Sequence, residues 1–107
     1  NALLRTGQAD IALGFEGIYD EFSSVTDFIY LMGNIYKQNA MYEPALEQYQ
    51  KALQMSPGRL NGVNSFLPLY QSGLIFETLG NREAAASLYQ KCGDFSPALQ
   101  RLAILQT

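Results

Sequence analysis

This chain contains the stretch Ile29-x-x-Met32-Gly33-x-x-Tyr36, followed by Ala45-x-x-x-Tyr49-x-x-Ala52 and then by Pro57. The same arrangement returns 40 residues later as Leu69-x-x-Ser72-Gly73-x-x-Phe76, then Ala85-x-x-x-Tyr89-x-x-Cys92, then Pro97, with identical offsets inside each copy. A fixed pattern of large and small residues over about 34 residues is how a repeated helix–turn–helix unit is encoded. Such a unit builds a surface for holding a partner and does not build a catalytic pocket.

Helix start and stop signals predict an all-α chain without strands. Thr26 or Ser24 is expected to cap the first well-marked helix, and Ser65 and Asn81 are expected to cap two later ones. Residues 59–65 are predicted to be an extended connection between the two copies. The expected helices span 27–38, 42–55, 66–79, 82–92 and 97–106, with a further helix over 8–21 from a partial N-terminal repeat.

The spacing of large and small residues predicts how the helices pair. Two antiparallel helices pack closely only where one offers a small residue and the other a large one. Gly33 and Ala45 are the small residues of the first pair, and Gly73 and Ala85 are those of the second. The large residues are Tyr36, Tyr49, Phe76 and Tyr89. Stacked pairs cover each other's apolar edges, so we expect one continuous core in a short right-handed superhelix.

The first helix of each pair is expected to line the concave face of this superhelix. We call its outward-facing residues the predicted strip and interpret them as a protein-binding surface, since exposed tyrosine offers both area and a hydrogen bond. A second interpretation stays open, in which a neighbouring segment that is missing from this chain buries Leu67, Tyr70 and Leu74. If the first is correct, Tyr30 and Tyr70 can be replaced with little loss of stability. The predicted strip consists of Asp27, Tyr30, Asn34, Lys37, Gln38, Leu67, Tyr70, Leu74 and Glu77.

Composition excludes several classes of function. Apolar residues make up 48% of the 107 residues and the net charge is −3, so the chain is expected to fold and not to bind nucleic acid. It has no histidine and one cysteine, which argues against an internal disulfide, a metal site and histidine-based catalysis. No phosphate-binding glycine loop and no apolar run of about 18 residues occurs. We therefore expect no cofactor, no membrane span and no enzymatic activity in this chain itself.

The two copies resemble the tetratricopeptide repeat. The resemblance covers 26–59 and 66–99 well and 1–25 weakly. Residues 60–65 are interpreted as a connection and 100–107 as the continuation of a C-terminal capping helix. We expect the whole of 1–107 to form a single domain. Ile29 and Leu69 replace the usual aromatic residue. The resemblance implies a scaffold for protein–protein contact. One subclass grips C-terminal carboxylates. Asn34 matches one position of that clamp, but Tyr30 stands where the clamp needs a lysine or a similar donor.

A narrower resemblance concerns 62–70 and 91–99. These stretches are similar to the last repeat in the C-terminal tetratricopeptide regions of bacterial family 2 glycosyltransferases, in which a separate nucleotide-sugar domain does the chemistry. Since the chain starts at Asn1 and not at methionine, we expect a non-catalytic, cytoplasmic piece of such an enzyme that binds a protein, a peptide or the parent's own catalytic domain. The alternatives are a free-standing adaptor or secretion chaperone, and self-association through the exposed ends of the repeat stack.

Overall fold

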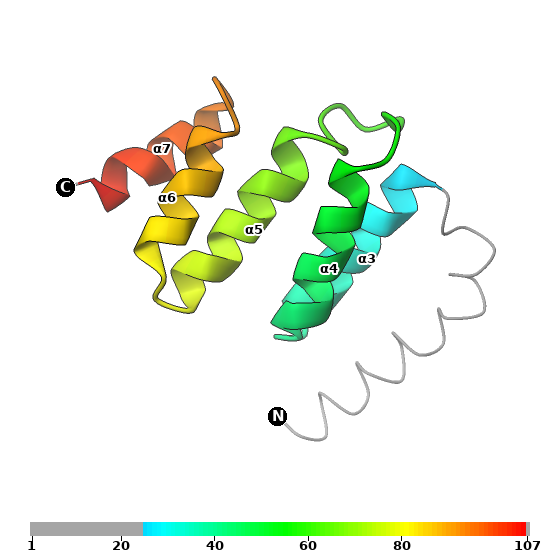
Figure 1. Cartoon of the computed structure of the whole chain (residues 1–107), viewed down its shortest axis with the longest axis horizontal. Coiled ribbons are helices and arrows are strands. Elements are labelled where there is room, and N and C mark those ends of the chain that lie inside the picture. The colour runs from blue at the N-terminus through cyan, green and yellow to red at the C-terminus, as the bar shows by residue number, and fades with distance from the viewer. Residues whose placement is uncertain (1–24, 107) are drawn as a thin grey trace.

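The computed structural model describes residues 25–106, and this part of the chain contains five α-helices. They are α3 (Thr26–Gln38), α4 (Tyr42–Leu53), α5 (Phe66–Thr78), α6 (Arg82–Gln90) and α7 (Ser96–Leu105), and this part contains no strand (Figure 1). The prediction of an all-α helical-repeat fold is confirmed, and each of these helices begins and ends within two residues of its predicted bounds. The helix expected over 8–21 lies outside the described residues.

The helices form two hairpins and a final single helix. α3 pairs with α4, and α5 pairs with α6, while α4 packs on α5 and α6 packs on α7. Figure 1 shows α7 at the end of the row opposite α3 and α4. α3 also contacts α5 directly, so the first helices of the two hairpins are neighbours, as a stack of repeats requires.

The predicted match of glycine against tyrosine holds each hairpin together. A Cβ atom added to Gly33 would lie 2.5 Å from Cε1 of Tyr49, and one added to Gly73 would lie 2.5 Å from Cε1 of Tyr89. Both tyrosines are fully buried. Only glycine leaves room for the ring at this depth, because real Cβ atoms essentially never approach another heavy atom so closely. The same contact in both hairpins explains the identical spacing of the two sequence copies.

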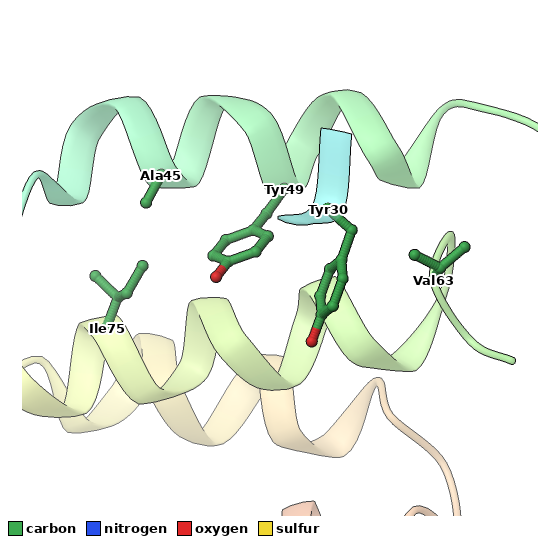
Figure 2. Packing of buried hydrophobic residues seen from close by; sticks show 5 residues of the cluster. All are labelled: Tyr30, Ala45, Tyr49, Val63 and Ile75. Atoms are coloured by element: carbon green, nitrogen blue, oxygen red, sulfur yellow. The ribbon is translucent and has the colours of Figure 1, made fainter. Parts of the chain in front are cut away.

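Two apolar clusters join the neighbouring units. Figure 2 shows the first cluster, in which side chains from α3, α4, α5 and the connection meet between the ribbons of α4 and α5. Its buried members are Tyr30, Ala45, Tyr49, Val63 and Ile75. The second cluster joins α6 to α7 through Ala85, Tyr89, Cys92 and Ala98. Each hairpin therefore depends on its neighbour to cover its apolar edge.

Of the three predicted helix caps, one differs from the structure, one is confirmed in position only and one is confirmed with its hydrogen bond. The N-cap of α3 is Val25, and the Thr26 hydroxyl instead donates to the Ser56 carbonyl oxygen at 2.6 Å, which ties the start of α3 to the chain leaving α4. Ser65 occupies the N-cap of α5, but its side chain makes no capping hydrogen bond. Asn81 caps α6 as expected, since its Oδ1 accepts from the Ala84 amide at 3.1 Å.

The connection over 59–65 was expected to be extended, and this expectation is wrong. Successive turns form it, with the Val63 amide donating to the Leu60 carbonyl at 3.2 Å and the Ser65 amide donating to the Gly62 carbonyl at 3.0 Å. Val63 is fully buried in the first cluster. Gly62 adopts a φ of +82°, which a residue with a side chain rarely does. The chain folds back because burial of Val63 requires it and Gly62 permits it.

Candidate protein-binding surface

The predicted strip comes from α3 and α5, which the fold brings into contact. A hydrogen bond crosses between them, from Nε2 of Gln71 to the hydroxyl of Tyr30 at 3.3 Å. Gln71 was not among the predicted residues, because its place between two strip positions gave no sequence signal. Its Oε1 is buried and accepts no hydrogen bond from the described residues. The two helices thus present one surface, although its members differ widely in accessibility.

Tyr30 was assigned to the outward face, and this assignment is wrong. Its side chain is only 6% exposed and belongs to the first cluster. Its ring lies 5.8 Å from that of Tyr49, at an interplanar angle of 47°. The reason is that α5 packs against this side of α3, so the position faces the next repeat as well as the groove. Tyr30 consequently contributes to stability and is not available to a partner.

Asp27 belongs to the strip by position but is engaged by the connection. Its carboxylate accepts from the Arg59 amide at 2.8 Å and from the Leu60 amide at 2.9 Å. These backbone hydrogen bonds, that from Leu60 first, hold the pKa of Asp27 below its ordinary value. Asp27 therefore fixes the chain that leaves the first hairpin, and it offers little to a partner.

Asn34 is likewise used within its own hairpin. Its Oδ1 accepts a hydrogen bond from the hydroxyl of Tyr49. The position 40 residues later is Leu74, which cannot accept a hydrogen bond, and there the hydroxyl of Tyr89 donates to Oε1 of Glu77 at 2.7 Å. Burial, above all, raises the pKa of both tyrosines, so both hydroxyls stay protonated and act as donors.

Glu77 links the second hairpin to the last helix. Its carboxylate forms an ion pair with the guanidinium of Arg101 on α7, whose Nε lies 3.1 Å from Oε1. This hydrogen bonding to Arg101 is the main cause that holds the pKa of Glu77 below its ordinary value. Arg101 escaped the sequence prediction because nothing in its neighbourhood indicates a partner on α5. Glu77 is thus committed to an internal contact.

The three apolar members of the strip are half-buried. Leu67 packs against the first cluster, while Tyr70 and Leu74 pack against the second. Phe95 stands edge-on to Tyr70, with ring centroids 5.4 Å apart. The chain itself covers one side of these residues. The second interpretation, in which a segment missing from this chain buries them, stays a prediction. The uncovered sides remain on the strip.

Lys37 and Gln38 complete the strip at the C-terminal end of α3. Gln38 is exposed, and Lys37 is half-buried. Partial burial lowers the pKa of Lys37, because desolvation disfavours the charged ammonium group. Within residues 25–106 the ammonium group makes no ion pair. We call Lys37, Gln38, Tyr70 and Leu74 the accessible strip, since each keeps surface for a partner. Leu67 is left out because it packs against the first cluster.

The described residues show no sign of a metal site. They contain no group of three or more histidine, cysteine, aspartate or glutamate side chains that could hold an ion. None of the helices in this part is long and apolar enough to cross a membrane.

Comparison with known families identifies the fold. A family model described as tetratricopeptide repeat matches residues 26–59 and 68–98, which together are more than half of the chain. The chain belongs to the tetratricopeptide repeat family. Such repeats suggest a protein–protein interaction module and are typically non-catalytic. No curated protein and no solved structure matches this tetratricopeptide repeat chain.

Residues 62–70 and 91–99 pack against each other. The rings of Phe66 and Phe95 have centroids 4.5 Å apart, and Sγ of Cys92 lies 3.5 Å from the Phe66 carbonyl oxygen. Cys92 is 6% exposed, and burial raises the pKa of its thiol, so it acts as a small core residue. These contacts give Phe66, Cys92 and Phe95 a structural role inside the repeat.

Proposed function

We propose that this tetratricopeptide repeat chain is a protein-binding scaffold without catalysis of its own, and that it binds through the accessible strip. The observation that carries the proposal is the pairing of two family repeats with a strip on α3 and α5 that keeps Lys37, Gln38, Tyr70 and Leu74 available. The apolar sides of Tyr70 and Leu74 favour an apolar partner side chain.

Lys37 indicates which polar group a partner would supply. Its pKa is lowered because burial removes water from the ammonium group. A partner carboxylate placed against Lys37 would stabilise its charged ammonium group in place of the missing water. The same desolvation would strengthen this ion pair. We therefore expect peptides in which an apolar residue and a carboxylate lie within one short segment.

Binding can be tested with peptides selected from a random library on the immobilised chain. Lys37→Ala and Leu74→Ala should each weaken a selected peptide, with losses above roughly fivefold, the level at which a truncated side chain counts as important. The matched controls are Lys91→Ala and Leu79→Ala, which remove exposed residues of the same types outside the strip. Equal losses in the controls, or no loss in the strip variants, would refute this surface.

We further propose that the chain is the non-catalytic, cytoplasmic part of a larger bacterial glycosyltransferase. The support is the resemblance of residues 62–70 and 91–99 to repeats of that enzyme family. An antibody raised to the chain should detect a native polypeptide several times larger than 11.9 kDa, whose reading frame encodes a nucleotide-sugar domain. A native band near 11.9 kDa would contradict this proposal and favour the free-standing adaptor or secretion chaperone. The acidic composition without histidine is consistent with that alternative.

A further inference from the structure

The exposed face of α7 has the same residue pattern as a face that is already used inside the fold. α7 begins 30 residues after α5, and in this register Leu99 corresponds to Leu69 and Ala103 to Gly73. On α5 this face packs against α6, where Tyr89 covers Gly73. On α7 the corresponding residues are exposed, with Leu99 45% accessible. α7 thus carries a helix-pairing face that no helix in the described part of the chain covers.

The opposite side of α7 is firmly attached, so this face is presented in a fixed orientation. Ala98 is fully buried against α6 in the second cluster. Arg101 binds Glu77 on α5, and Arg82 Nη2 donates to the Leu105 carbonyl oxygen at 2.8 Å. A face whose orientation is already fixed loses little conformational entropy when it binds.

Ala103 disfavours pairing of α7 with a helix that places a tyrosine ring over this position, as α4 and α6 do over Gly33 and Gly73. At Gly33 and Gly73 a tyrosine ring lies so close that an added Cβ atom would be 2.5 Å from it. Ala103 carries that Cβ atom, so a tyrosine could not seat there as it does in the two hairpins. An aliphatic side chain such as leucine, lying over alanine at ordinary contact distance, fits instead.

The exposed face is complementary to itself. Ser96, Leu99, Ala103 and Gln106 follow a spacing of three, four and three residues, which places them on one side of the helix, and all four are exposed. If two α7 helices pack antiparallel about residue 101, Leu99 of each copy lies on Ala103 of the other. Ser96 then lies opposite Gln106, so polar residues meet polar residues at both ends.

Charge does not oppose this pairing. Arg101 is the charged residue of α7, and it is bound to Glu77 on the inner side. The outer face brings no like charges together when two copies meet. We propose that a second copy of this chain covers the face, forming a two-fold symmetric dimer through antiparallel α7 helices. Each copy contributes mainly one helix, so we expect an interface below about 1,200 Å² and a dimer that dissociates on dilution.

A charge exchange across the predicted contacts tests the proposal with the whole 107-residue chain. One variant carries Leu99→Glu and Ala103→Glu, and the other carries Leu99→Lys and Ala103→Lys. Each should sediment as a monomer, because like charges face each other across the two-fold axis. An equimolar mixture should form a dimer that contains both variants, because each introduced carboxylate then faces an introduced ammonium group. The wild-type chain should shift from dimer to monomer on dilution.

The controls are Leu60→Glu and Leu60→Lys, which change a leucine of nearly the same exposure, 46% against 45% for Leu99. Leu60 belongs to the connection between α4 and α5, which lies far from α7 (Figure 1). These variants should dimerise like the wild type. A wild-type chain that is monomeric at every attainable concentration would overturn the proposal and leave the face to another segment or protein. Dimerisation of the two doubly substituted variants by themselves, or failure of the mixture to dimerise, would also overturn it. The result is independent of peptide binding at the accessible strip.

Discussion

Replacing Gly33 with alanine would test how tightly each hairpin is packed. The added Cβ atom would lie 2.5, 2.8 and 3.0 Å from Cε1, Cδ1 and Cζ of Tyr49. The ring cannot easily move aside, because it is fully buried and its hydroxyl donates to Asn34. The substitution must therefore push the two helices apart or break that hydrogen bond.

The magnitude follows from opposing terms. Alanine gains about 1 kcal/mol over glycine through helix propensity. Overpacking costs about 1–3 kcal/mol, and a lost hydrogen bond costs about 1 kcal/mol more. The free energy of unfolding of Gly33→Ala should thus fall by about 1–3 kcal/mol. For a chain of this size the melting temperature falls by roughly 4–8 °C for each kcal/mol lost.

Urea denaturation measures this change as a shift in midpoint at constant slope. Combining the substitution with Tyr49→Leu, which removes the ring, provides the control. In that background Gly33→Ala should be neutral or should stabilise by up to about 1 kcal/mol, as propensity alone dictates. Gly73→Ala repeats the test against Tyr89. A gain in stability from Gly33→Ala in the wild-type background would refute the packing account.

Three further substitutions test separate features. Tyr30→Ala should lower the free energy of unfolding by about 3–5 kcal/mol, as for other buried aromatic residues. A urea midpoint unchanged from the wild type would show that Tyr30 is a surface residue after all. Asn81→Ala should lower the free energy of unfolding, measured in a thermal melt, by about 1 kcal/mol because it removes a capping hydrogen bond. Ser65→Ala should change it little because the Ser65 hydroxyl makes no capping hydrogen bond. Equal effects of the two substitutions would contradict the capping assignment. Hydrogen bonding to Arg101 holds the pKa of Glu77 below its ordinary value of 4.5. The ion pair therefore stabilises the fold fully above pH 4.5, and this stabilisation is lost as the pH falls through the lowered pKa. Glu77→Gln should therefore flatten the acid side of the stability profile, and an unchanged profile would show that the ion pair contributes nothing.

The helices and their pairing could be predicted because they depend on local and repeated signals. Pro57 and Gly58 mark a helix end, and the shared offsets of Gly33 to Tyr49 and Gly73 to Tyr89 fix the hairpin contacts. Such patterns are read along the chain. The turns over 59–65 could not be predicted in the same way, because they form when Val63 enters a cluster built from other helices.

The binding surface was harder to predict because accessibility depends on neighbouring helices. Tyr30 and Tyr70 occupy matching positions in the two copies, yet Tyr30 is buried under α5 and Tyr70 is only half-covered by Phe95. Glu77 carries a charge that looks available in the sequence, but Arg101 on α7 binds it. Repeat position fixes which helix face a residue occupies, whereas the next repeat decides how much of that face stays open.

The most direct test of the account is amide chemical-shift mapping of the isotope-labelled chain with a library-selected peptide. We expect the largest shifts at Lys37, Gln38 and Leu74, on the helices that carry the accessible strip. Glu47 and Gln50, which are exposed on α4, should not shift. Shifts concentrated on those two residues, with none on the accessible strip, would contradict the claim that this tetratricopeptide repeat chain binds its partner there.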